Sequence, residues 1–148
     1  MKPYFLKYNE ITEDYLFTDK HIHTDWIHAK SSILEIIEKS REIGLNQIAI
    51  TEHCRKESDY YGAFYAEVDK HRKNLSDVEI LVGYEAKITN YDGSIDVSKK
   101  IKNLSEISIG SVHNFPVGEI FYKPKFFEKK LCQELEFRLT IAGIENNE

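Results

Sequence analysis

The chain has 148 residues, of which 41% are hydrophobic and 30% charged, a size and balance typical of one soluble domain with its own core. Its formal net charge of -5 at pH 7 argues against a broad attraction to duplex nucleic acid or anionic lipid, although bound cations would reverse the sign locally. We therefore expect a single domain over residues 1–148, and a small anionic substrate stays open.

The cysteine content and the first residues bear on where the protein works. Cys54 and Cys132 lie far apart and form neither a zinc-ribbon pair nor a disulfide framework. The opening sequence MKPYFLKYNEITEDY has no apolar signal core, and no apolar run reaches the roughly 18 residues of a membrane span. We expect two reduced thiols, no membrane segment and a cytoplasmic protein.

Strand-like and helix-like patterns alternate along the chain. The predicted elements, in order, are a strand over residues 15–23, a helix over 33–43, a strand over 47–51, a helix over 63–74, a strand over 79–82, a short helix over 98–104, a strand over 106–112 and a long helix over 125–144. Ser31 or Ser32 can cap the first helix, and Gly44 ends it. The repeated order of strand, helix and strand predicts parallel strands joined by right-handed crossovers, and hence an α/β fold.

Four short blocks place metal-capable side chains at the ends of the predicted strands. The blocks are HIHT at residues 21–24, ITEHCR at 50–55, VGYEAK at 82–87 and GSVHNF at 110–115. Because ligands bind at the carboxyl ends of parallel strands in α/β folds, these side chains are expected to converge. The residues concerned are His21, His23, His53, Glu85 and His113. A mixed imidazole and carboxylate set suits zinc, manganese or iron better than magnesium or calcium.

The spacing within the blocks indicates a role for each side chain. His21 and His23 are two positions apart, so in a strand both point to the same face and can hold one cation. Alternation lets only one of Glu52 and His53 face the site. We favour His53 as a ligand and Glu52 as a residue that orients a ligand imidazole. Glu85 has two carboxylate oxygens and can bridge two cations.

In order and spacing, these blocks resemble the first four motifs of the polymerase and histidinol phosphatase (PHP) superfamily, over about residues 18–116. The resemblance implies a distorted, seven-stranded, TIM-like β/α barrel that hydrolyses phosphoesters with two or three divalent metal ions. It also implies that the five residues above are metal ligands, with Glu85 as the bridge. The second motif is usually Thr-Asp-His, whereas this chain has Thr51, Glu52 and His53. The family's last motif is absent, so we expect a barrel truncated to about four βα units, with open edges that favour self-association.

Further residues near the blocks are weaker candidates for the site. Arg55 follows the second block and is suited to binding a substrate phosphate through its forked guanidinium. His28 is either another ligand, as in some relatives of the family, or a histidine of a surface loop. Asp19 and Asp25 flank the first block and are candidates for orienting its imidazoles.

These observations favour a metal-dependent phosphoesterase in which cations bind the phosphate and activate a water, with Glu85, His113 and Arg55 at the reacting group. The expected partner is a small phosphorylated substrate, because the acidic surface disfavours duplex DNA. Two alternatives stay open. One is a non-catalytic PHP-like binding or scaffold domain. The other is an amidohydrolase-like metal-dependent hydrolase acting on C–N bonds, which shares the opening His-x-His.

Overall fold

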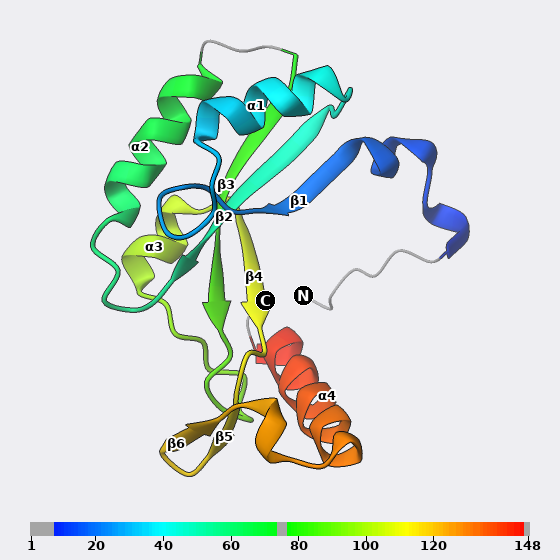
Figure 1. The fold of residues 1–148 in the computed structure, drawn as a ribbon, viewed down its shortest axis with the longest axis vertical. Coiled ribbons are helices and arrows are strands. Elements are labelled where there is room, and N and C mark those ends of the chain that lie inside the picture. Colours follow the sequence, from blue (N-terminus) through cyan, green and yellow to red (C-terminus); the bar gives the residue numbers. More distant parts are fainter. Residues whose placement is uncertain (1–7, 74–76, 147–148) are drawn as a thin grey trace.

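A curled sheet of four parallel strands forms the centre of the computed structural model, which describes residues 8–73 and 77–146 (Figure 1). The strands are β1 (Thr18–Ile22), β2 (Gln47–Cys54), β3 (Glu79–Lys87) and β4 (Ile107–Ser111), and they lie side by side in chain order. Helices α1 (Ile33–Glu42), α2 (Tyr61–Arg72) and α3 (Lys99–Leu104) connect successive strands. The predicted α/β class is confirmed, and the curled sheet has the form of half a barrel. The seven-stranded closure stays a prediction.

The remaining elements lie before β1 and after β4. Two short 3-10 helices, η1 (Tyr8–Glu10) and η2 (Glu13–Phe17), precede the sheet. After β4 come the antiparallel hairpin of β5 (Phe115–Val117) and β6 (Ile120–Tyr122), the 3-10 helix η3 (Pro124–Phe126) and α4 (Lys129–Asn146). In Figure 1 the hairpin lies beyond the carboxyl ends of β3 and β4, and α4 leads back from it to make contact with β4. Within the described ranges, no helix is both long and apolar enough to cross a membrane.

The first helix shows how local sequence fixes an element. The Ser32 hydroxyl accepts a hydrogen bond from the Glu35 amide, while the Glu35 carboxylate accepts one from the Ser32 amide at 2.8 Å, which is a complete capping box. Gly44 follows the helix with a φ of 78°, a left-handed conformation that suits glycine and ends the helix. Between these signals, Ile33 and Ile37 are spaced one turn apart and are both buried. The predicted cap and stop are therefore where the structure has them.

The main core lies between the helices and one face of the sheet. Alternate residues of β2, such as Ile48 and Ile50, point to this face and pack with residues of α1 and α2 that include Ile37 and Phe64. The opposite face carries small residues near its middle, among them Gly83, where an added Cβ would lie 2.6 Å from the Ile107 carbonyl oxygen. Gly83 thus allows β3 to approach β4 closely, and Glu85 is the next residue of β3 on the same face.

Several predicted boundaries were wrong. Residues 15–17 form part of η2 rather than a strand, because β2 begins at Gln47, which pairs with Thr18, and offers no partner further back. Strands β2 and β3 run further than predicted, so His53 and Glu85 lie within them rather than after them. The last helix begins at Lys129 instead of residue 125, after the 3-10 turn at Pro124. The second helix spans 61–72, starting two residues earlier than predicted, and Asn74 lies outside the described residues.

Candidate metal centre

The carboxyl ends of the strands bring the four sequence blocks together. His53 on β2 and Glu85 on β3 are register partners, so their side chains stand next to each other on one face of the sheet. A register shift between Asp19 and Ile22 on β1 lets His21 join that face, and His23 follows just after the strand. His113 lies two residues beyond the end of β4. The five predicted ligands therefore lie together at the carboxyl ends of the four strands.

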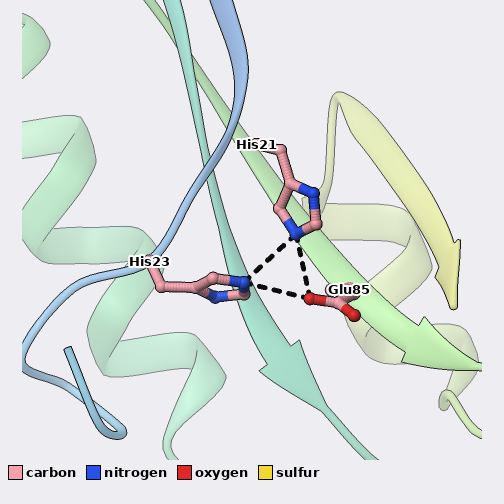
Figure 2. A group of neighbouring side chains, drawn as sticks. All are labelled: His21, His23 and Glu85. Atoms are coloured by element: carbon pink, nitrogen blue, oxygen red, sulfur yellow. Dashed lines mark hydrogen bonds and ion pairs between the residues drawn. The ribbon is translucent and has the colours of Figure 1, made fainter. Parts of the chain in front are cut away.

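The carboxylate of Glu85 is the hub of this cluster. Its Oε2 lies 2.9 Å from His21 Nε2, 3.0 Å from His23 Nε2 and 3.2 Å from His53 Nδ1. Its Oε1 lies 2.9 Å from His113 Nε2. Figure 2 shows His21, His23 and Glu85, with both imidazoles pointing at the carboxylate. One carboxylate thus contacts four imidazoles.

The donor set fits metal ions. The side chains form two groups, and within each group the ligand atoms lie within 4.8 Å of one another. The first group is His21, His23 and Glu85, and the second is His53, Glu85 and His113. His21 Nε2 and His23 Nε2 lie 3.1 Å apart, so two nitrogen atoms that can each offer a lone pair face one another. A cation between such atoms would satisfy both, and imidazole with carboxylate is a common set for zinc, manganese and iron. Because Glu85 belongs to both groups, it is placed to bridge two ions.

The environment lowers the pKa of Glu85 and of His53. Glu85 is only 3% exposed, and burial alone would raise its pKa. Hydrogen bonds from His21 and Ser111, together with nearby imidazole charge, outweigh that effect and lower the pKa. Burial lowers the pKa of His53, and the neighbouring histidines add to this, while Glu85 opposes it. An ionised carboxylate and a neutral imidazole are the forms that ligate a cation.

Glu52 lies on the other face of β2, beneath the loop that follows β1. Its Oε1 accepts hydrogen bonds from the amide and the hydroxyl of Thr24, at 2.5 and 2.6 Å, and the side chain is fully buried. Its Oε2 lies 3.6 Å from His23 Nδ1, the ring nitrogen that points away from Glu85. Glu52 is therefore next to this nitrogen without a hydrogen bond to it, and its role in orienting the imidazole stays a prediction.

The weaker candidates fall into different places. His28 lies beside the cluster, with its ring centroid 4.8 Å from that of His53 and 5.6 Å from that of His23. Asp19 accepts a hydrogen bond from the backbone amide of His21 at 3.1 Å, so it supports the bend of β1 rather than an imidazole. Asp25 is exposed, and its backbone amide bonds to Ser31. The loop between β1 and α1 thus brings His28, and not Asp25, towards the site.

An open cavity of about 670 Å³ adjoins the cluster. His53, Glu85 and His113 form part of its wall, and Arg55, Lys87 and Asp96 supply further charge. Burial lowers the pKa of Lys87, Asp96 opposes this shift, and Arg55 adds to it. Sequence reasoning identified Arg55 but missed Lys87. The available signal was its position two residues after Glu85, which in a strand places both side chains on one face.

Cys54 also lines the cavity, at the end of β2. Burial raises the pKa of its thiol to about 11, although a hydrogen bond with Tyr60 acts the other way. At neutral pH the thiol therefore stays protonated, and a protonated thiol is a poor nucleophile and a poor metal ligand. The Tyr60 hydroxyl donates a hydrogen bond to the carbonyl oxygen of His53, so this pair holds the strand end that carries the ligand.

The fold and the cluster define an α/β protein with a candidate metal centre at the carboxyl ends of parallel strands. Residues 19–143 match the PHP domain, and the chain belongs to this family. This match confirms the resemblance found in the four sequence blocks, and it extends from β1 into α4.

Similar proteins include several probable phosphatases of bacteria. That of Clostridium acetobutylicum is 32% identical over 98 residues, which are 65% of this chain and 40% of that protein. That of Caldicellulosiruptor saccharolyticus is 31% identical over 113 residues, 72% of this chain and 46% of that protein. A third, from Caldanaerobacter subterraneus subsp. tengcongensis, is 33% identical over 105 residues, 67% of this chain and 40% of that protein. The chain thus spans less than half the length of each of these three relatives.

Proposed function

We propose that this chain is a metal-dependent phosphoesterase domain that acts on a small phosphorylated substrate. The proposal depends above all on Glu85, whose carboxylate contacts the imidazoles of His21, His23, His53 and His113. We propose these five residues as the ligands of two or three zinc, manganese or iron ions. Membership of the PHP family and relatives named probable phosphatases support a phosphoester substrate.

In this proposal the metal ions and the residues around them have separate roles. When bound, the cations would supply Lewis-acid stabilisation of the phosphoryl oxygens and lower the pKa of a water. Glu85, which is buried, would hold the ligand groups together, and Glu52, whose Oε2 lies 3.6 Å from His23 Nδ1, would orient the ring of His23. Arg55, on the cavity wall, is suited to orienting the phosphate through two parallel hydrogen bonds.

Metal analysis combined with a substrate panel tests the proposal. Purified protein reconstituted with zinc, manganese or iron should retain the ion after desalting, and single alanine variants of His21, His53 or His113 should retain less. His71→Ala is the matched control, since His71 lies on α2 away from the cluster. Folded protein that binds none of these ions would contradict the proposal.

The substrate panel separates the alternatives. Hydrolysis of phosphoesters, with no action on cyclic amides, is the expected result. Turnover of cyclic amides alone would instead support the amidohydrolase-like reading. Metal binding without turnover of any phosphoester would favour a PHP-like binding domain.

We also propose that the chain self-associates through its open sheet edges. Strands β1 and β4 end the sheet, and next to β1 the side chains of Leu16 and Phe17 are 74% and 47% exposed. Unpaired edges attract other strands. Light scattering should show a dimer or larger species, and a monomer at high micromolar concentration would contradict this.

A further inference from the structure

Lys87 is an unassigned cation in the wall of the candidate active site. It is the last residue of β3, two positions after Glu85, and it lines the same cavity as Glu85 and His113. Its side chain is partly buried. Among the described residues no carboxylate lies within the 4.0 Å of an ion pair with its ammonium group, so the charge has no direct acidic partner there.

An aromatic ring holds this ammonium group in place. Lys87 Nζ lies 3.1 Å from the centroid of the Phe121 ring, which belongs to β6 of the hairpin. A cation over an aromatic face is attracted by the ring quadrupole, which holds the ammonium group without neutralising its charge. The hairpin begins at Phe115, two residues after His113. The segment that carries one candidate ligand therefore also positions Lys87.

A second cation lies in the same cavity wall. Arg55 is exposed, and within the described ranges its guanidinium forms no ion pair. Asp96 also lines the cavity, but its carboxylate accepts a hydrogen bond from the Lys56 amide at 3.1 Å and is not within ion-pair distance of either cation. Two like charges beside one cavity repel each other, and an anion between them would remove that cost.

We propose that Lys87, positioned by Phe121, forms with Arg55 an anion-binding subsite that selects phosphate monoesters over diesters. This inference rests on the proposed phosphoesterase function. At pH 7 a monoester carries a charge of about -1.5 to -2 and three terminal oxygens, whereas a diester carries one charge and two such oxygens. A subsite with two cations beside a metal centre complements the first group better than the second.

Binding of inorganic phosphate to chelator-treated protein tests the subsite without turnover. Calorimetry at pH 7.5 should show binding by the unsubstituted protein. Lys87→Met should weaken it about 10- to 100-fold, the range of one charge-assisted hydrogen bond. Lys87→Arg should retain most of the binding, and Phe121→Leu should weaken it about 2- to 5-fold through loss of the ring face. Lys125→Met is the matched control, since Lys125 faces Phe126 at 5.3 Å outside the cavity.

Turnover of p-nitrophenyl phosphate and bis-p-nitrophenyl phosphate by the metal-loaded protein tests the selectivity. Lys87→Met should lower kcat/KM for the monoester about 10- to 100-fold and for the diester less than about 3-fold. Equal losses on both esters would overturn the selectivity. Phosphate binding that is absent, or unchanged in Lys87→Met, would overturn the subsite.

The two arms separate failure of this inference from failure of the proposed function. Lys87-dependent phosphate binding without turnover of either ester would contradict the phosphoesterase proposal and support the anion subsite. Turnover combined with phosphate binding that is insensitive to Lys87 would support the phosphoesterase proposal and overturn the anion subsite. Circular dichroism of each variant shows that the comparison is made between folded proteins.

Discussion

The sheet region, residues 18–104, and the C-terminal region, residues 107–146, are packed in different ways. The first buries a continuous cluster of apolar residues between β2, β3 and the three helices. The second buries only Phe115 and Leu139 in a small cluster with Ile88 of the first region, and it leaves Phe126 and Phe137 each 66% exposed. The candidate ligands follow this division, because the Glu85 side chain is 3% exposed and that of His113 is 59% exposed. The proposed bridging ligand, Glu85, is thus held by the densely packed region, and one of its partners, His113, by the loosely packed region.

The largest expected effect comes from removing the charge of the bridging ligand. Glu85→Gln should abolish retention of both ions, because Glu85 Oε1 and Oε2 serve the two ligand groups at once. The loss should exceed the roughly 10- to 100-fold typical of outer-shell partners. His113→Ala should empty mainly the group that contains His53. Metal content per chain, measured by mass spectrometry after desalting, would contradict the bridge if Glu85→Gln kept one full equivalent.

A matched pair of phenylalanines tests the packing difference itself. Phe64 is fully buried against Tyr61 and Trp26, with ring centroids at 5.4 and 6.0 Å, whereas Phe137 lies on the surface of α4. Phe64→Ala should lower the free energy of unfolding by about 3–5 kcal/mol, and Phe137→Ala by less than about 0.5 kcal/mol. Urea titration followed by circular dichroism measures both. Similar losses in the two variants would mean that Phe137 is covered in solution.

The sequence was sufficient to predict the sheet region and the convergence of the five candidate ligands. Strand ends with His and Glu side chains can be recognised locally, and parallel pairing brings them together whatever the loops do. It was not sufficient for His28, which approaches His53 because the Ala29 amide bonds to the Thr24 carbonyl and turns the loop inward. Lys87 was missed for a related reason. Its partner Phe121 comes from a hairpin whose position depends on tertiary packing.

A glycine pair tests how tightly β3 must approach its neighbours. In Gly83→Ala the new Cβ would lie 2.6 Å from the Ile107 carbonyl oxygen and 2.9 Å from Thr51 Cγ2, so backbone has to move. We expect a loss of about 2–3 kcal/mol in unfolding free energy, together with weaker metal retention, because Glu85 is two residues away. Gly62 on α2 has nothing within 4 Å of the added Cβ, and Gly62→Ala should stabilise the protein by about 0.5 kcal/mol. Thermal unfolding that ranks the two variants in the opposite order would contradict this reading of the sheet.

The smallest expected effects come from two hydroxyl groups, one in each region. The Ser32 hydroxyl accepts a hydrogen bond from the Glu35 amide, a donor that has no partner within the helix. Ser32→Ala should therefore destabilise the protein by about 1 kcal/mol. The Thr140 hydroxyl in α4 donates a hydrogen bond to the Glu136 carbonyl oxygen at 2.8 Å. Both residues lie inside the helix, and the helix does not depend on this side-chain bond. Thr140→Ala should be neutral or stabilising by up to about 0.5 kcal/mol, because alanine is the better helix former.

The capping effect should also depend on pH. Hydrogen bonds from the amide and hydroxyl of Ser32 lower the pKa of Glu35. A lowered pKa in the folded state means that the contribution is present above the unfolded pKa of about 4.3 and is lost as the pH falls through the folded value. Ser32→Ala removes the hydroxyl, so its cost should be smaller at pH 3 than at pH 7. The cost of Thr140→Ala should not change over this range. Urea titrations of both variants at the two pH values measure this, and a cost of Ser32→Ala that is independent of pH would show that the Ser32 hydroxyl is not coupled to the charge of Glu35.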